Sequence, residues 1–318
     1  MALLPQLNDL CLELRGLNFP HKQDEVRKFV NFHRLSLIGL RETKVRYGNR
    51  LKVAENLLLG WRLVFNYQTQ GTGWIWAAWD PSVLSVQLLS SSAQLIHLAV
   101  QILETQEQFL ISFVYGLNYP QDRVPLWDAI ASISQTSSHL PWALMGDFNV
   151  TRMVTEKMGG NTSWTPDMEA INTCCYNAEL EDLQHRGQWF TWSNKNPENP
   201  ISRKLDRVLV NPTWHTIFPN AEAEFTPPGV SDHSPAVVRL GLPLPCLRKP
   251  FRFFNFLADH PSFGPTVDAA WLNPVEGSPL YQVCCKLKRV KDGLRSLNLS
   301  SFSNLPSRST NARKKLFD

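Results

Sequence analysis

The chain lacks the cysteine patterns that organise small secreted domains or structural zinc sites. Its six cysteines include two adjacent pairs, and none stands in a CxxC spacing. Because adjacent cysteines rarely bridge each other, the sequence argues against a disulfide framework, a zinc site and a disulfide-linked partner. This cysteine usage fits a reducing, intracellular compartment.

Long apolar runs are missing as well. No stretch approaches the roughly 20 apolar residues that cross a membrane. The N-terminal leucines are interrupted by Pro5, Asn8, Asp9 and Glu13, and no Lys or Arg precedes Arg15, which matches a secretory signal poorly. The sequence therefore predicts neither a membrane span nor a membrane partner.

Charge is present but unevenly placed. From Pro243 onward there are 12 Lys/Arg and 5 Asp/Glu, a balance of +7, out of 32 and 28 in the whole chain; residues 1–242 therefore carry 20 against 23, or −3. An acidic region that holds cations, followed by a basic segment, would suit a polyanionic partner. A solvated basic helix explains the tail equally well, and charge alone does not separate these readings.

Short apolar runs separated by turn signals make up most of the chain. Strands are predicted over residues 10–15, 35–40, 61–67, 74–79, 83–89, 95–103, 109–115, 142–145, 190–193, 204–211 and 236–240, and helices over 21–34, 122–138, 166–183 and 281–299. Residues 151–164 are predicted as an irregular loop. Many strands, few helices and no regular βαβ alternation favour a layered α/β domain with largely antiparallel sheets.

A proline-rich segment at 242–245 marks the end of this domain. Residues 1–242 are thus predicted as one domain and 243–318 as a basic, partly helical connector. His97 lies inside a predicted strand, which favours a core or sheet-face histidine over a catalytic one.

The stretch around which the rest is organised is 144–150, where an apolar strand ends in Gly146-Asp147-Phe148-Asn149. Asp147 and Asn149 are two residues apart, so on an extended backbone they point to the same side. Gly146 would allow a close approach to the backbone. A strand followed by an Asp/Asn turn, without any catalytic role, is a simpler explanation of the same residues.

Other apolar strands carry polar residues at or near their ends. They deliver Glu42, Tyr115, Asp206 and the pair Asp232-His233. Taken singly, each residue also has an explanation without a catalytic role: a solvated loop acid, an ion pair with a neighbouring arginine, or a turn. Because strand ends converge at one edge of a packed sheet, the repeated placement predicts a shared site.

The chemistry of such a set is specific. Carboxylate and amide oxygens without a thiolate favour a hard cation, Mg²⁺ or Mn²⁺. A histidine beside an acid suits proton transfer or hydrogen bonding to a developing oxyanion. No serine or cysteine has the setting of an activated nucleophile, so the sequence predicts a phosphate-ester site at which water attacks.

Five segments now stand in a fixed order: Glu42-Thr43-Lys44, Val114-Tyr115, Gly146-Asp147-Phe148-Asn149, Leu205-Asp206-Arg207-Val208-Leu209 and Ser231-Asp232-His233-Ser234-Pro235. In this order they resemble the endonuclease/exonuclease/phosphatase superfamily, which includes apurinic endonucleases and DNase I. Four further segments resemble the endonuclease region of plant LINE-type non-LTR retrotransposons: residues 15–18, 190–194, 249–256 and 301–304.

The resemblance implies an α/β fold of two packed, mostly antiparallel sheets flanked by helices, the DNase I-like four-layer sandwich, followed by a helical basic extension. It implies a Mg²⁺-dependent endonuclease that nicks DNA to leave a 3′-hydroxyl. It also implies a nuclear location and a chain that is truncated before a reverse transcriptase region.

The resemblance also implies roles for single residues. Glu42 resembles the metal-ligand glutamate, Asp147 the acid that aligns or deprotonates water, Asn149 its neighbour at the phosphate or metal, Tyr115 and His233 the phosphate contacts, Asp206 the acid that orients His233, and Asp232 a further metal-shell acid. Lys44, Arg207 and Trp192 lie in matching segments and are expected to contact nucleic acid. Which acid is the general base stays open.

One departure from the family pattern stands in the first strand. The family usually reads Trp-Asn-Val-Arg-Gly-Leu there, whereas this chain reads Leu12-Glu13-Leu14-Arg15-Gly16-Leu17. Glu13 could serve as an extra metal ligand, but its charge would raise the proton affinity of the neighbouring acids and repel phosphate. This departure leaves a catalytically weakened retrotransposon remnant that still binds nucleic acid as one alternative. A phosphatase of the same superfamily for small phosphate esters is another.

Overall fold

The structure is a computed structural model that describes residues 8–13, 17–67, 72–229, 231–241, 257–258, 260–277 and 279–302. The chain divides into two units, Met1–Leu244 and Pro245–Asp318. The sequence Gln70-Gly71-Thr72-Gly73 is typical of a hairpin turn, and it lies partly outside the described residues. The segment 249–256 lies wholly outside them. The role of the second unit as a connector stays a prediction.

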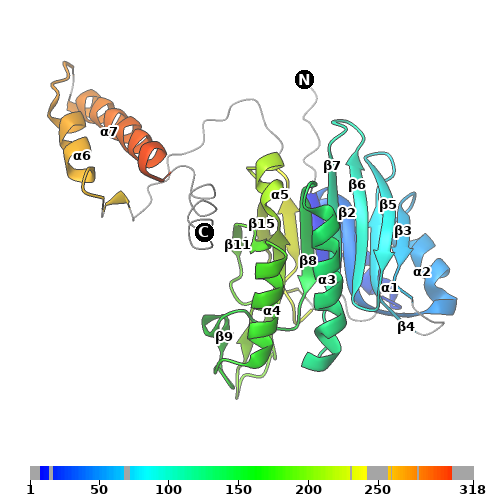
Figure 1. Cartoon of the computed structure of the whole chain (residues 1–318). Helices are drawn as coiled ribbons and strands as arrows, with labels where there is room; N and C mark the ends of the chain where they lie inside the picture. The colour runs from blue at the N-terminus through cyan, green and yellow to red at the C-terminus, as the bar shows by residue number, and fades with distance from the viewer. Residues whose placement is uncertain are drawn as a thin grey trace. The chain divides into compact units, whose positions relative to one another are not determined.

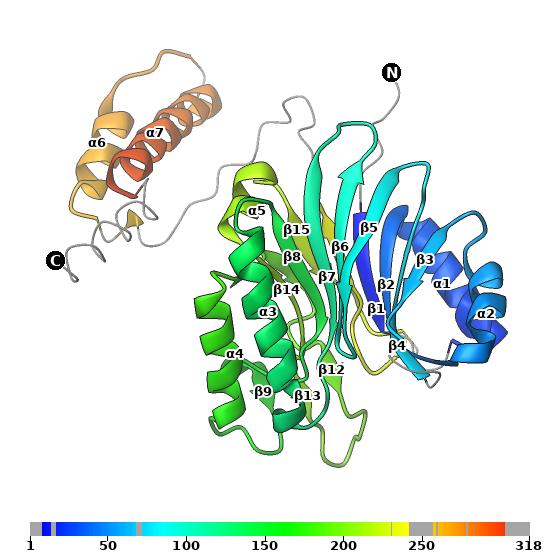
Figure 2. The same cartoon turned by 45° about the vertical axis from the view of Figure 1, so that its right-hand side comes forward.

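Two large sheets form the centre of the first unit (Figures 1 and 2). One has the order β11-β15-β16-β1-β2-β4-β3 and the other β10-β14-β8-β7-β6-β5. The first comprises β1 (Asn8–Glu13), β2 (Leu35–Arg46), β3 (Arg62–Phe65), β4 (Thr72–Trp79), β11 (His185–Gly187), β15 (Glu222–Phe225) and β16 (Ala236–Arg239). The second comprises β5 (Leu84–Ser91), β6 (Leu95–Ile102), β7 (Gln108–Tyr115), β8 (Trp142–Asp147), β10 (Glu181–Asp182) and β14 (Asp206–Val210).

Helices cover the outer face of each sheet. On the seven-stranded sheet lie α1 (Pro20–His33) and α2 (Arg50–Leu57), and on the six-stranded sheet lie α3 (Val124–Ser137) and α4 (Pro166–Asn177) (Figure 2). Three separate apolar cores fill the three spaces between these four layers. The predicted fold class, two packed sheets flanked by helices, is therefore confirmed.

The alternation of side chains along β2 shows how the layers are built. Leu37 packs in the core between the sheets, whereas Ile38 and Leu40 pack in the core beneath α1 and α2. Gly39 faces the opposite sheet at close range, because a Cβ there would lie 2.2 Å from the ring of Phe113. Leu37 and Gly39 therefore point toward the six-stranded sheet, and Ile38 and Leu40 point away from it.

Pairing is mostly antiparallel, as expected, with parallel pairs between β1 and β2, β7 and β8, and β11 and β15. A third sheet, which the sequence did not predict, has the order β12-β13-β9. Its strands are β9 (Lys157–Met158), β12 (Trp192–Ser193) and β13 (Ser202–Arg203). Part of the predicted irregular loop 151–164 is therefore strand β9, preceded by a 3-10 turn at Val154–Glu156.

Two predicted boundaries were wrong by six residues each. The helix expected over 166–183 ends at Asn177, because Glu179 takes a left-handed conformation and residues 181–182 pair with β14 instead. The strand expected to end at Leu40 continues to Arg46, so the charged cluster Arg41–Lys44 lies within β2. Two short helices were not predicted: α2, and α5 (Pro212–Ile217), which is too short to show a helical period.

The second unit contains α6 (Phe263–Leu272), which was not predicted, and α7 (Pro279–Phe302), which was (Figure 1). The two helices pack closely, since a Cβ at Gly293 of α7 would lie 2.9 Å from Thr266 of α6. Leu294 and Leu297 are buried in this unit, while Leu280 and Leu287 are exposed.

Candidate active site

The end of β8 carries the central motif. Asp147 is the last residue of this strand, whose six residues are all buried. Gly146 has φ +148°, and a Cβ there would lie 2.0 Å from the carbonyl oxygen of Val114 on β7. Glycine is thus required by the neighbouring strand, whereas the sequence suggested that it makes room for a ligand.

Asn149 follows in a left-handed conformation, with φ 52°. Its backbone N–H donates to Asp147 Oδ1 at 2.7 Å, and its side-chain Nδ2 donates to the carbonyl of Gly116 at 2.7 Å and to Asn118 Oδ1 at 3.2 Å. The carboxylate of Asp147 and the amide of Asn149 are therefore both held in place by local hydrogen bonds.

Three neighbouring strands place three of the predicted residues side by side. Asp147 is in register with Tyr115 on β7 and with Asp206 on β14. The ring of Tyr115 stacks on Trp74 of β4 at 5.7 Å between centroids. The backbone N–H groups of Leu205 and Asp206 both donate to Thr191 Oγ1, at 3.0 and 2.9 Å.

His233 reaches the same place from the segment before β16. Its Nδ1 lies 2.8 Å from Asp206 Oδ2. Ligand atoms of Asp147, Asp206 and His233 all lie within 4.8 Å of one another, and the three residues are buried. Because an ionised carboxylate only accepts hydrogen bonds, the pair places a hydrogen on Nδ1.

Glu42 joins the site through an irregularity in β2. Between Arg41 and Val45 the strand has two more residues than its partner β4, and Glu42 and Lys44 both adopt left-handed φ values. Such a bulge re-aims side chains. The carboxylate of Glu42 accepts a hydrogen bond from the Tyr115 hydroxyl at 2.7 Å and lies 3.4 Å from Lys44 Nζ.

Asp232 and Trp192 lie beside His233. The indole Nε1 of Trp192 donates to Asp232 Oδ2 at 3.2 Å, and Trp192 forms an isolated bridge with His233. Glu13 ends β1, where its backbone is in register with Arg41. Its side chain lies outside what the structure describes, so its part in metal binding stays a prediction.

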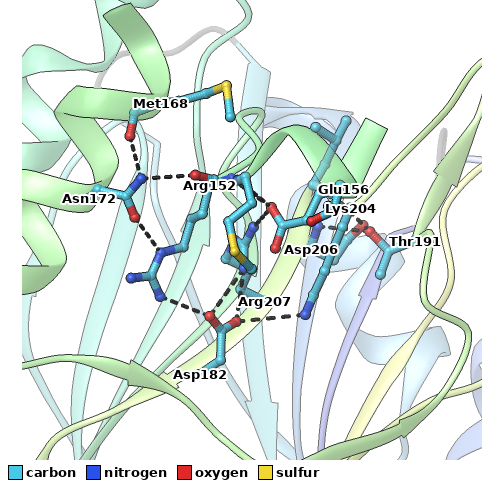
Figure 3. Close-up of polar contacts among 12 residues, drawn as sticks. Arg152, Glu156, Met168, Asn172, Asp182, Thr191, Lys204, Asp206 and Arg207 are labelled. Carbon is cyan, nitrogen blue, oxygen red and sulfur yellow. Dashed lines mark hydrogen bonds and ion pairs between the residues drawn. The ribbon is translucent and has the colours of Figure 1, made fainter. Parts of the chain in front are cut away.

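Arg207 does not belong to this site, contrary to expectation. It points to the opposite face of β14 from Asp206, is 1% exposed, and pairs with Glu156 and with Asp182 at 2.9 Å. Figure 3 shows this network, which Arg152 and Lys204 complete. A guanidinium enclosed by two carboxylates is not available to a nucleic acid, so Arg207 is excluded as a contact.

His97 is a buried residue of β6, in agreement with the sequence. Its Nδ1 lies 2.8 Å from Ser112 Oγ, which also accepts a hydrogen bond from Trp142 Nε1 at 3.0 Å. Burial lowers the pKa of His97 to about 4, so the ring is neutral at physiological pH.

The two facing acids differ in their proton affinity. Burial raises the pKa of Asp147, and the nearby charge of Asp206 adds to this, while His233 and Arg41 oppose it. Burial also acts to raise the pKa of Asp206, but the charges of His233 and Arg41 and their hydrogen bonds outweigh it and lower the pKa to about 2. Asp206 is thus ionised at neutral pH, whereas Asp147 is suited to accepting a proton.

The donor set fits a hard divalent cation. Both oxygens of Asp206 are engaged, by Arg41 and by His233, so its carboxylate acts on the histidine. Glu42 and Asp147 supply the remaining buried carboxylates, and oxygen ligands of this kind are those that Mg²⁺ and Mn²⁺ prefer. The identity of the metal stays a prediction.

Sequence reasoning missed three residues of this site. Arg41 was not singled out, Trp74 was only part of a predicted strand, and Thr191 was only part of the family-like segment 190–194. The positions of Leu37 and Gly39 on the inter-sheet face imply the same face for Arg41, which is the signal that could have revealed it. The stacking of Trp74 and the acceptor role of Thr191 depend on contacts between distant segments.

Two sheets packed face to face, with helices outside and these acids at one edge, make up the DNase I-like fold. A family model described as the endonuclease/exonuclease/phosphatase family matches residues 10–233. The match spans more than half of the chain, which therefore belongs to this family of hydrolases acting on phosphodiesters and phosphate esters.

Solved structures share the fold at low sequence identity. The endonuclease domain of TRAS1, a telomere-specific non-LTR retrotransposon, is 12% identical, with TM-score 0.54 over 73% of this chain and 97% of that one. The 3′ phosphatase NExo from Neisseria, bound to a product DNA hairpin, is 15% identical, with TM-score 0.55 over 73% and 98%. The AP endonuclease LMAP from Leishmania major is 13% identical, with TM-score 0.57 over 73% and 86%.

Comparison with curated proteins gives no match. Among the helices that the structure describes, none combines the length and apolar character needed to cross a membrane.

Proposed function

We propose that the protein is a divalent-metal-dependent endonuclease that nicks DNA and leaves a 3′-hydroxyl. The observation that carries the proposal is the buried cluster in which Asp147 stands within 4.8 Å of the His233–Asp206 pair. A proton acceptor, an oriented histidine and a cation-binding acid set together suit water attack on a phosphodiester. The fold shared with a retrotransposon endonuclease and an AP endonuclease supports DNA as the substrate.

The residues take the following roles in this proposal. Glu42 would hold the cation, with Asp232 and Glu13 near it, and the bound cation would polarise the phosphate oxygen and lower the pKa of its water. Asp147, the last residue of β8, aligns the attacking water and accepts its proton. The Asn149 side-chain amide donates to Gly116 and Asn118, and one of these hydrogens must change acceptor to contact the phosphate.

His233 is the main donor to the phosphate. Asp206 fixes its Nδ1–H, so that Nε2, when protonated, can donate to a phosphate oxygen. The Tyr115 hydroxyl donates to Glu42, and must change acceptor to contact the phosphate. Lys44 and Trp192, at the margin of the site, are the proposed nucleic-acid contacts, and a nuclear location follows from such a substrate.

The test is the nicking of supercoiled plasmid by the purified chain. We expect relaxed circles with Mg²⁺ or Mn²⁺ and none with EDTA, and extension of the nicks by a DNA polymerase, which requires a 3′-hydroxyl. Asp147→Ala and His233→Ala should abolish nicking, while Asp128→Asn and His139→Ala, matched exposed residues, should not change it. Nicking that survives both site substitutions would rule out the proposal.

A weakened remnant is the second candidate, and Glu13 favours it. Its backbone is in register with Arg41, which contacts Asp206, so residue 13 belongs to the neighbourhood of the acids. If the added charge impairs catalysis, Glu13→Asn should raise the nicking rate by tenfold or more, in line with about 1.4 kcal/mol per decade. An unchanged rate would show that Glu13 is harmless.

A phosphatase for small phosphate esters is the third candidate, because the family includes phosphatases. Turnover on duplex DNA and on a soluble inositol phosphate should be compared at equal metal concentration. We expect a higher kcat/KM on DNA, and the reverse order would assign the site to small esters.

A further inference from the structure

Arg41 occupies an unusual position for a charged side chain. It is 1% exposed, yet it lies on β2 of the seven-stranded sheet and points across the layer toward the six-stranded sheet. Leu37 and Gly39, which precede it on the same face, pack against the apolar core and against Phe113. The inter-sheet face of β2 is thus apolar at Leu37 and Gly39, and it ends with the guanidinium of Arg41, which contacts the carboxylate of Asp206.

The contact that Arg41 makes there is specific. Its Nη2 donates to Asp206 Oδ1 at 2.5 Å, while Asp206 Oδ2 lies 2.8 Å from His233 Nδ1. The carboxylate is therefore held at both oxygens, by one sheet on one side and by the histidine on the other. A carboxylate fixed in this way sets the direction in which it accepts the hydrogen on Nδ1, and with it the plane of the imidazole.

Arg41 also adjoins the bulge that brings Glu42 into the site. The left-handed backbone at Glu42 is strained for a residue with a side chain, and persists only where surrounding contacts fix it. Arg41 bonds Asp206 immediately before the bulge, and Glu42 accepts a hydrogen bond from Tyr115 within it. These two contacts tie β2 to the opposite sheet on consecutive residues.

We propose that Arg41 is a positioning residue for phosphoester hydrolysis, holding the Asp206 carboxylate so that His233 presents Nε2 to the phosphate. The inference rests on the proposed function for its catalytic consequence. Its structural consequence, the orientation and tautomer of His233, is independent of any activity. Arg41 does not touch the reacting atoms in this arrangement and acts through Asp206.

The test compares Arg41→Met with Arg41→Lys. The methionine removes the charge and the hydrogen bonds at similar length, and the lysine keeps a cation. We expect Arg41→Met to lower kcat for nicking about 10- to 100-fold with KM changed less than about twofold. Arg41→Lys should recover part of the loss.

Arg207→Met is the matched control. Arg207 is the residue after Asp206, is equally buried and is also paired with carboxylates, but it lies on the opposite face of β14. Arg207→Met should lower the melting temperature without lowering kcat, when kcat is measured well below the melting temperature of each variant. If it does not fold, Arg207→Lys takes its place.

A second measurement does not need activity. The imidazole ¹⁵N resonances of His233, assigned by their loss in His233→Gln, should show the Nδ1–H tautomer in the metal-free wild type. They should shift toward a mixture of tautomers in Arg41→Met. Failure of the wild type to cleave any phosphodiester would refute the proposed function, while the resonances would still decide the positioning role. Unchanged resonances and unchanged kcat, with only a lower melting temperature, would overturn the inference.

Discussion

Asp147 and Asp206 face each other in register on adjacent antiparallel strands, yet their pKa values move in opposite directions. The difference arises from their partners. Asp206 has a cation or a hydrogen-bond donor on each oxygen, whereas Asp147 receives a neutral backbone N–H from Asn149. One strand pair therefore supplies both a fixed anion and a proton acceptor.

This pair predicts stability effects of opposite sign in metal-free protein. Because the pKa of Asp147 is raised in the folded protein, its contribution to folding stability falls as the pH rises above 3.8, the ordinary pKa of the group. At pH 7 the charge of Asp147 is therefore destabilising. The lowered pKa of Asp206, about 2, means that its contribution is present above pH 3.8 and lost as pH falls toward 2. We therefore expect Asp147→Asn to raise, and Asp206→Asn to lower, the melting temperature at pH 7 in EDTA.

The expected shifts are several degrees, since about 1 kcal/mol moves the melting temperature of a domain of this size by roughly 2–4 °C. Asp128→Asn, an exposed substitution, serves as the control. A lower melting temperature for Asp147→Asn would contradict the unfavourable burial of its charge.

His97 predicts a separate loss of stability in acid. Its pKa falls from 6.5 to about 4 on folding, so the unfolded chain binds a proton in this window and the folded chain does not. The stability is complete above pH 6.5 and declines as pH falls toward 4, by about 2 kcal/mol at pH 5. His97→Gln should remove this part of the acid sensitivity in urea unfolding at pH 7.5 and 5. His139→Gln, on an exposed histidine, should leave it unchanged.

Arg207 predicts a change in stability with no change in DNA binding. Replacing it by methionine leaves Glu156, which is 0% exposed, without its guanidinium partner. Breaking a buried pair in this way is expected to cost about 3–5 kcal/mol. The double variant Arg207→Met/Glu156→Gln should recover part of that loss in denaturant unfolding. A flatter salt dependence of DNA affinity in a folded Arg207 variant would instead indicate a phosphate contact.

The sequence predicted the layers because strand periodicity and the two sets of helices are local patterns. It also predicted that Asp147, Asp206 and His233 meet, because each follows or begins an apolar strand. The two-residue bulge in β2 could not be predicted, since it depends on Tyr115 and Asp206 in the opposite sheet. Arg207 was misassigned for a related reason: alternation places it on the face opposite Asp206, but its partner Glu156 lies in a 3-10 turn too short to show periodicity.

The basic helix α7 offers the last prediction, on DNA affinity. Lys288 and Arg289 are exposed on α7, in the part of the chain with a balance of +7. If this helix contacts the phosphate backbone, Lys288→Glu/Arg289→Glu should weaken binding to a DNA duplex. The slope of log affinity against log salt should fall by about two, because each phosphate contact contributes about 0.9.

Lys28→Glu/Lys52→Glu is the matched control, since it reverses two exposed charges on α1 and α2 of the first unit. Fluorescence anisotropy between low and physiological salt measures both slopes. Equal slopes for wild type and the α7 variant would identify α7 as a solvated basic helix. A reduced slope for the α7 variant alone would show that α7 contacts DNA. Net charge changes equally in both variants, so it could not explain the difference.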